Sequence, residues 1–142
     1  MPATTVDIAE AVKEALNGGS FSQAFSAVRA YRPEYDLEGL KDLRVTVVPK
    51  ALEVAPVSRG SANHNIDVDV AVQKRTGMGT SAIDALMVLV EEIADFFRQK
   101  RLPDHETAVW IGATNEPVYS PEHLREHGVF TSVLTLSFRV VR

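Results

Sequence analysis

The sequence contains no cysteine among its 142 residues. Composition therefore excludes disulfide bonds, thiolate metal ligands and a cysteine nucleophile. Basic residues are also in the minority, because 15 Lys and Arg stand against 19 Asp and Glu, which gives a formal charge of -4. A protein that binds nucleic acid by neutralising phosphates carries the opposite sign of charge, so we expect no sequence-specific binding of nucleic acid.

Long hydrophobic runs are missing as well. The most apolar stretch, Ala85 to Val90, is bounded by acidic residues and is far too short to span a bilayer, so no membrane partner is expected. Hydrophobic residues make up 45% and charged residues 24% of the chain, as in ordinary globular domains. A chain of this length builds one core, and we predict a single α+β domain over residues 1–142.

Several segments have the β-branched composition or the period-two alternation of strands. Two stretches between them are rich in turn-forming or polar residues and are predicted to be loops, residues 56–62 and 112–116. The predicted strands are residues 26–31, 44–49 with a possible extension over 51–54, 63–73, 108–111 and 130–141.

Two longer segments place apolar residues at helical spacing. The first covers residues 8–16 and stops at Gly18-Gly19. The second runs from Ser81, the predicted N-cap, to about residue 100. Residues 121–126 begin with proline and could form a single helical turn. With the strands, these segments predict a mixed or mostly antiparallel sheet of about four to six strands packed against two main helices.

The second helix is apolar over an unusually wide arc. Besides its main apolar stripe, it carries Leu89 and Phe96, seven residues apart, at the side of that stripe. A helix that covers one sheet needs an apolar arc of roughly 100°, and this one has about twice that arc at ~100° per residue. The excess face needs a second partner, which is either the N-terminal helix or another subunit.

One stretch has the literal form of a catalytic motif. His123, Glu126 and His127 match H-x-x-E-H, in which two histidines bind zinc and a glutamate activates water. Pro121 and Gly128, however, confine any helix here to about one and a half turns. The strand predicted to follow contains no acidic residue that could act as a third ligand, so a solvated connector is the favoured interpretation.

Two further patterns have weak chemical meaning. Residues 77–82 fit G-x-G-x-x-A before a helix, but a dinucleotide fold needs a buried parallel strand in front of it. Asn63, Asn65, Asp67 and Asp69 alternate along one strand and offer oxygen ligands, yet they lack the loop of an EF-hand. An acidic stripe that faces solvent or a lumen is the simpler interpretation, and we expect no cofactor.

A small basic and aromatic cluster could touch a nucleic acid or a protein partner. In an acidic chain a single cluster of this kind is weak support for nucleic-acid contact. It consists of Arg29, Tyr31, Arg32 and Tyr35.

The order of elements resembles that of small neck and tail-completion proteins of tailed bacteriophages, above all the tail terminators. The strings that carry this resemblance are Arg29-Ala30-Tyr31-Arg32-Pro33, the segment from Leu37 to Pro49, and the closing strand from Phe130 to Val140. The similarity covers most of the chain as an architecture, but none of these strings is a catalytic or metal signature.

The resemblance implies a small α+β subunit of the virion, not an enzyme and without a cofactor. Such a subunit forms a ring with itself, usually a hexamer, which caps the tail tube, ends its polymerisation and offers a docking surface to a head-connector or neck protein. It is found in the virion tail or neck, and in the host cytoplasm during assembly. We expect Leu89 and Phe96 to contact a neighbouring subunit, and Asp67 and Asp69 to line the lumen, since a ring that passes DNA should not grip it.

Two other functions stay open. One is a small zinc-dependent hydrolase that uses His123, Glu126 and His127. The other is a cytoplasmic ligand-binding or regulatory module, which ligand would stabilise against heat.

Overall fold

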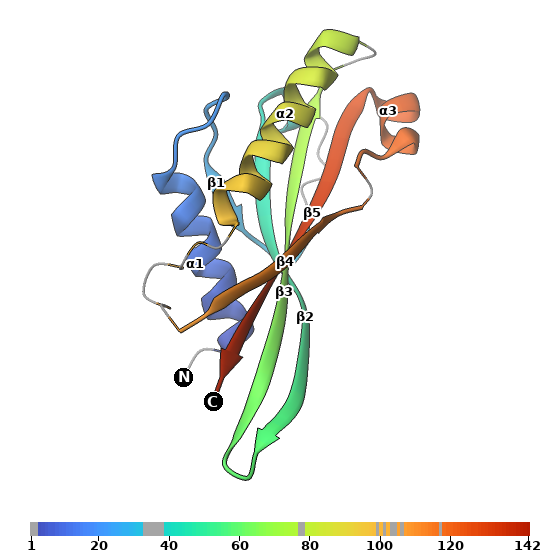
Figure 1. The fold of residues 1–142 in the computed structure, drawn as a ribbon. Coiled ribbons are helices and arrows are strands. Elements are labelled where there is room, and N and C mark those ends of the chain that lie inside the picture. The colour runs from blue at the N-terminus through green and yellow to red at the C-terminus, as the bar shows by residue number, and fades with distance from the viewer. Residues whose placement is uncertain are drawn as a thin grey trace.

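The computed structural model describes residues 3–32, 39–76, 79–98, 100, 102, 105, 107–116 and 118–142. These residues form one five-stranded sheet with helices packed against it (Figure 1). The α+β class predicted from the sequence is confirmed. The elements are α1 (Thr4–Gly18), β1 (Ala27–Arg29), the 3-10 helix η1 (Gly39–Lys41), β2 (Arg44–Ser58), β3 (Ser61–Arg75), α2 (Thr80–Phe97), β4 (Val109–Asn115), α3 (Pro121–His127) and β5 (Val129–Val141).

The sheet has the strand order β1-β2-β3-β5-β4. Short β1 runs parallel to β2, and every other neighbouring pair is antiparallel. The sheet is therefore mixed but mostly antiparallel, as expected. Its longest ladders join β3 to β2 on one side and to β5 on the other, so β3 lies in the middle of the sheet.

The two faces of the sheet differ in polarity. On one face, Ile66, Val68, Val70 and Val72 of β3 are completely buried and form one core cluster with the apolar residues of α1 and α2. The opposite face, which we call the open face, carries the alternate residues of β3; it is partly exposed at Asp67 and Asp69 and buried at Ala71 and Gln73. Successive side chains of a strand point to opposite faces, and this alternation separates the core from the polar side.

Both predicted long helices are present. α1 ends at Gly18, as its glycines predict, and the N–H of Gly19 donates to the Leu16 carbonyl. α2 begins at Thr80, and Gly79 is its N-cap, without a side-chain hydrogen bond at that end. The prediction of Ser81 as N-cap is therefore wrong, because the helix starts before it. None of the described helices is long and apolar enough to cross a membrane.

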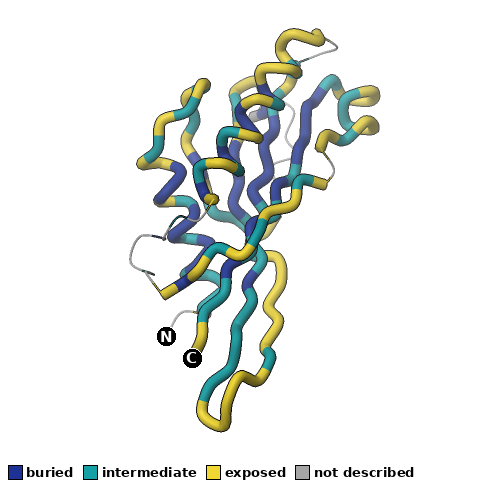
Figure 2. Tube along the Cα trace, in the orientation of Figure 1, coloured by how far each residue is buried: buried dark blue, intermediate teal, exposed yellow. Residues whose placement is uncertain are grey.

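β2 and β3 extend past the body of the domain as a long hairpin (Figure 1). The turn predicted over residues 56–62 is present but confined to Arg59 and Gly60, since Pro56 pairs with Ala62 and Ser58 with Ser61. Bulges at Pro49/Ala51 and at Pro56/Ser58 let the ladder continue past residues that cannot donate a backbone hydrogen bond. The far part of the hairpin is exposed along β2 and partly buried along β3 (Figure 2).

β4 is longer than predicted. Residues 112–115, expected to be part of a polar loop, continue the strand because they pair with residues 134–137 of β5. A register shift between Trp110 and Gly112 leaves Ile111 without an opposite residue on β5. The predicted turn near residue 121 is present as α3, capped by the Ser120 side chain and ended by Gly128 at φ 64°, a left-handed conformation that favours glycine.

Candidate functional site

The open face carries a ladder of polar side chains across β3 and β5. The Ser137 hydroxyl donates to Asp67 (2.6 Å), and the Thr135 hydroxyl donates to Asp69 (2.6 Å). The Lys50 ammonium lies 3.7 Å from Asp69. Both predicted lumen-lining aspartates thus lie side by side on one face, as their spacing in the sequence indicates.

These aspartates have ready hydrogen-bond donors within the chain. Carboxylates that accept bonds from hydroxyls and lie near an ammonium are stable without a bound cation. The next position of the ladder is neutral or basic, because Arg139 Nε donates to Asn65 Oδ1 at 2.9 Å. Within the described ranges, no three His, Asp or Glu side chains gather as metal ligands. The open face is therefore a polar surface of mixed charge.

The wide apolar arc of α2 is covered within the same chain. Leu89 is completely buried in the core. The Phe96 ring packs edge-on against Phe21 and Phe97, with centroids 5.1 Å apart in each pair, and the Lys100 ammonium lies 3.9 Å from its centre. Contact of Leu89 and Phe96 with another subunit stays a prediction, but Leu89 has no exposed surface in this chain.

The partner that covers this arc is the segment after α1, which sequence reasoning did not identify. Phe21 and Phe25 stack with centroids 5.3 Å apart and pack against the core. The Ser22 N–H donates to Glu92 of α2 at 3.2 Å, and the Ser22 hydroxyl donates to the same carboxylate oxygen. The two phenylalanines four residues apart were the available signal.

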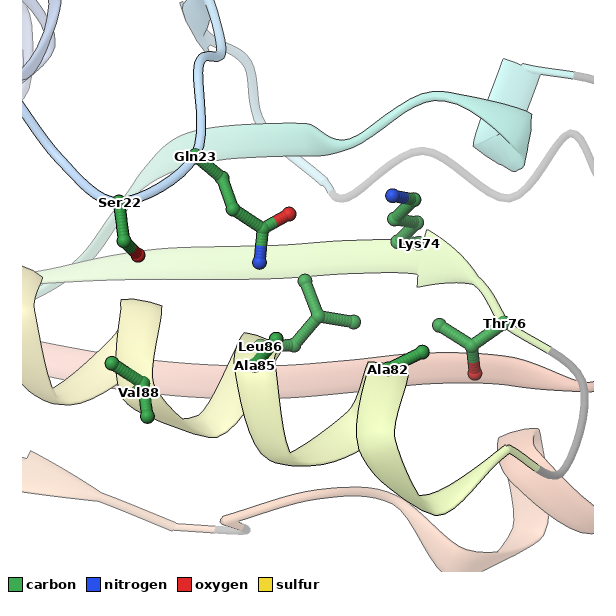
Figure 3. Close-up of a pocket in the computed structure, with 8 residues that line it drawn as sticks. All are labelled: Ser22, Gln23, Lys74, Thr76, Ala82, Ala85, Leu86 and Val88. Atoms are coloured by element: carbon green, nitrogen blue, oxygen red, sulfur yellow. The ribbon is translucent and has the colours of Figure 1, made fainter.

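Beside this segment, an open groove of about 390 Å³ runs between residues 22–23 and the first half of α2 (Figure 3). Its floor and walls include Leu86, Ala82, Ala85 and Val88, and among its described lining residues Lys74 alone is charged. General acid-base chemistry needs at least one positioned titratable group near a reacting atom, commonly two. The described residues of this groove provide no such pair.

The histidines of α3 do not form a metal centre with the residues described around them. His123 Nδ1 lies 3.0 Å from the Thr131 hydroxyl of β5, whereas His127 Nε2 lies 3.9 Å from its neighbour Glu126. α3 is seven residues long and has no buried residue. The structure thus places the H-x-x-E-H pattern on a short exposed helix, and no third ligand for zinc lies beside it among the described residues.

The remaining sequence patterns are partly resolved. Gly77 and Met78 of the glycine-rich turn, and Tyr35 of the basic-aromatic cluster, lie outside the described residues. Arg29 lies 2.6 Å from Glu10 of α1 and 5.5 Å from the centre of the Tyr31 ring. The hydrogen bond from Arg29, followed by that from Lys13, lowers the pKa of Glu10. The ion pair between Arg29 and Glu10 therefore connects β1 to α1.

Exposed apolar side chains gather along the two sides of the sheet. On β2, Leu52 is 50% and Val54 is 53% exposed, and on β4, Val109 is 58% and Ile111 is 40% exposed. Sequence reasoning found the strands but not this exposure, because it depends on which strands lie at the edge. Contiguous exposed apolar surface on a soluble domain commonly marks an interaction site.

Comparison with solved structures finds the same fold in a virion component. A chain of the structure described as "Virion of native gene transfer agent (GTA) particle" superposes with a TM-score of 0.55 at 15% sequence identity. The superposition covers 99% of this chain and 100% of that one. No protein-family model and no curated protein matches the sequence. At this identity the similarity shows a common fold.

Proposed function

We propose that this chain is a structural subunit of a phage-like virion, with an assembly role and no catalytic one. The observation that carries the proposal is the fold shared from end to end with a chain of a gene transfer agent virion. Full coverage of both chains means that the whole architecture is shared and not only a common motif. The lack of a catalytic arrangement in the groove and on α3, within the described residues, agrees with this role.

The specific role that we propose is that of a tail terminator. Copies of the chain form a ring, a hexamer in the simplest case, that caps the tail tube and ends its polymerisation. The same ring offers a surface to a head-connector or neck protein. The sequence resemblance to tail terminators supports this role, and so do the exposed apolar side chains at both sides of the sheet, which a monomer would leave in contact with water.

In such a ring we assign the open face to the lumen. Both long helices pack on the other face, which leaves the ladder that includes Asp67 and Asp69 free of a helical layer along the lower half of the sheet (Figure 1). In this lumen the carboxylates of Asp67 and Asp69 offset the nearby charges of Lys50 and Arg139, so the lining offers little net attraction to phosphate. DNA could then pass without being held.

Tube capping is the direct test of the proposed role. The full chain is mixed with a polymerising tail tube protein of the same genome, and the particles are imaged by negative stain. We expect rings at tube ends and shorter tubes as the chain concentration rises. Tubes of unchanged length without end density, together with a monomeric mass at every concentration, would contradict the proposal.

The lumen assignment has a separate test. Asp67→Asn with Asp69→Asn removes two charges and keeps an oxygen that accepts from Ser137 and Thr135. We expect rings to form normally and DNA delivery by the assembled particles to fall. Unchanged delivery would remove the support for an acidic lining while leaving the capping role in place.

A further inference from the structure

Within the described residues, the sheet has two free edges at opposite sides. β4 is the last strand on one side. On the other side, β1 pairs with β2 only from Val45 to Val47, so β2 has no strand beside it from Val48 onward within the described part of the chain. Unpaired edges of this length are templates for pairing with another chain unless they are protected.

The two free edges lie opposite each other across the sheet, at the two ends of the same rows of paired residues. The pairing register connects Glu53 of β2 through Asn65 and Arg139 to Val109 of β4. Higher in the sheet, it connects Val48 through Asp69 and Thr135 to Thr114. Residues 48–53 of β2 and residues 109–114 of β4 are therefore the two ends of the same rows of residues.

The strand directions at these edges are compatible with head-to-tail pairing. From β2 through β3 and β5 to β4, each strand is antiparallel to the next, so β4 runs opposite to β2. When a second copy is placed beside the first in the same orientation, β2 of that copy lies antiparallel to β4. This is the arrangement in which strands form closely spaced hydrogen-bonded pairs.

The side chains also continue across such a junction. On the core face, one row runs from Leu52 through Ile66 and Phe138 to Trp110. In the junction, half-exposed Leu52 of one copy would lie beside Trp110 of the next, which extends the apolar row. Pro49 and Pro56 cannot donate backbone hydrogen bonds, so they interrupt the row of donors on either side of residues 50–55 and restrict the register.

We propose that β4 of one copy pairs with the Val48–Ala55 edge of β2 in the next copy, so that the sheets join into one closed antiparallel sheet around the ring. The inference rests on the proposed ring-forming function and names the interface that builds the ring. Such an interface is heterologous, and it closes when the rotation between copies divides a full turn. The helices thicken one face of the sheet (Figure 1), so the joined sheet curves with its open face on the concave side.

Cysteine cross-linking tests this interface without competing links from native thiols, because the chain has no cysteine of its own. Val109→Cys is combined with Ala51→Cys, Glu53→Cys or Ala55→Cys, which lie on the same face and cover a shift of one step in either direction. Opposed strands bring Cα atoms within disulfide range. We expect one of these double variants to give a ladder of linked chains on a non-reducing gel, and peptide mapping to identify the β4–β2 link.

Matched variants separate this interface from other contacts. A mixture of the two single variants should stop at linked dimers, and Val109→Cys alone should stay unlinked, because the pairing is head-to-tail. Glu53→Cys with Val88→Cys, an exposed position on α2, should give no ladder. Thermal melting checks that each variant is folded.

The possible results test the β4–β2 edge pairing separately from the proposed capping role. Rings seen by negative stain without a link in any of the three double variants would overturn the edge pairing and leave the capping role intact. Linking of Val109→Cys to itself would overturn it too, because β4 would then pair with a second β4. A chain that stays monomeric and unlinked, with and without tail tubes, would overturn both.

Discussion

The ring of Phe21 meets that of Phe96 edge-on, with 5.1 Å between their centroids. This contact joins the segment after α1 to the end of α2 and covers the part of α2 that its own sheet does not. Phe96→Ala should therefore lower the free energy of unfolding by about 2–3 kcal/mol, somewhat below the value for a completely buried phenylalanine. Chemical denaturation of the monomer measures this change.

Phe96→Ala also distinguishes two roles for Phe96, packing within the monomer and contact with another subunit. Val88→Ala removes an exposed side chain from the same helix and should change the unfolding free energy by less than about 0.5 kcal/mol. If Phe96 instead served mainly as a subunit contact, Phe96→Ala would weaken oligomers and leave the unfolding of the monomer unchanged.

Substitutions at Gly19 and Gly18 form a matched pair that tests the packing of the Phe21 and Phe96 rings. A Cβ atom at Gly19 would lie 2.9 Å from Phe21 Cε2 and 3.1 Å from Phe96 Cε1, whereas one at Gly18 would meet nothing within 4 Å. We expect Gly19→Ala to destabilise the fold by about 1–2 kcal/mol through overpacking. Gly18→Ala should be neutral or stabilising by up to about 1 kcal/mol, since Gly18 ends a helix. Equal effects on thermal unfolding would contradict this assignment.

The contact between Glu10 and Arg29 gives a pH dependence with a defined sign. Hydrogen bonds from Arg29 and then Lys13 hold the pKa of Glu10 below its ordinary value of 4.5. A carboxyl with a lowered pKa stabilises the fold above its unfolded-state pKa, and this contribution is lost as the pH falls through its folded-state pKa. Glu10→Gln should therefore melt slightly below wild type at pH 7, with the difference vanishing under acid conditions. A difference that grows on acidification would be the wrong sign.

Zinc should have no effect on the α3 histidines. Because His123 contacts Thr131 and no described third ligand lies with the histidine pair, an equimolar amount of zinc should leave the melting temperature unchanged. Calorimetric titration of wild type and His123→Ala should give the same weak or absent heat. Stoichiometric binding that disappears in His123→Ala would revive the hydrolase alternative.

The parts of the fold that follow from local pattern could be predicted from the sequence. α1 is marked by its spacing and its glycines, and β3 and β5 by alternation. The far half of β2 and the end of β4 could not be, because Pro56 and Gly112 are signals of turns. Their strand conformation comes from pairing with residues elsewhere in the chain, which local propensity does not report.

The candidate site was only partly predictable for the same reason. Asp67 and Asp69 are two residues apart in a strand, and this spacing was sufficient to place them on one face of the sheet. The excess apolar arc of α2 correctly indicated a second partner, but the residue covering Phe96 is Phe21, which is distant in sequence. The free edges required the strand order, since a strand looks the same in sequence whether it is central or peripheral.

The central position of β3 also affects how the chain reaches its native state. β3 is synthesised well before β5, its partner along residues 63–75, and β4 depends on β5 as well. Until residue 141 has left the ribosome, the nascent sheet consists of the β2–β3 hairpin and β1, with one side of β3 unpaired. Pairings so distant along the chain close slowly, so completion of this sheet is a late event, and until then the unpaired edge of β3 is vulnerable to aggregation.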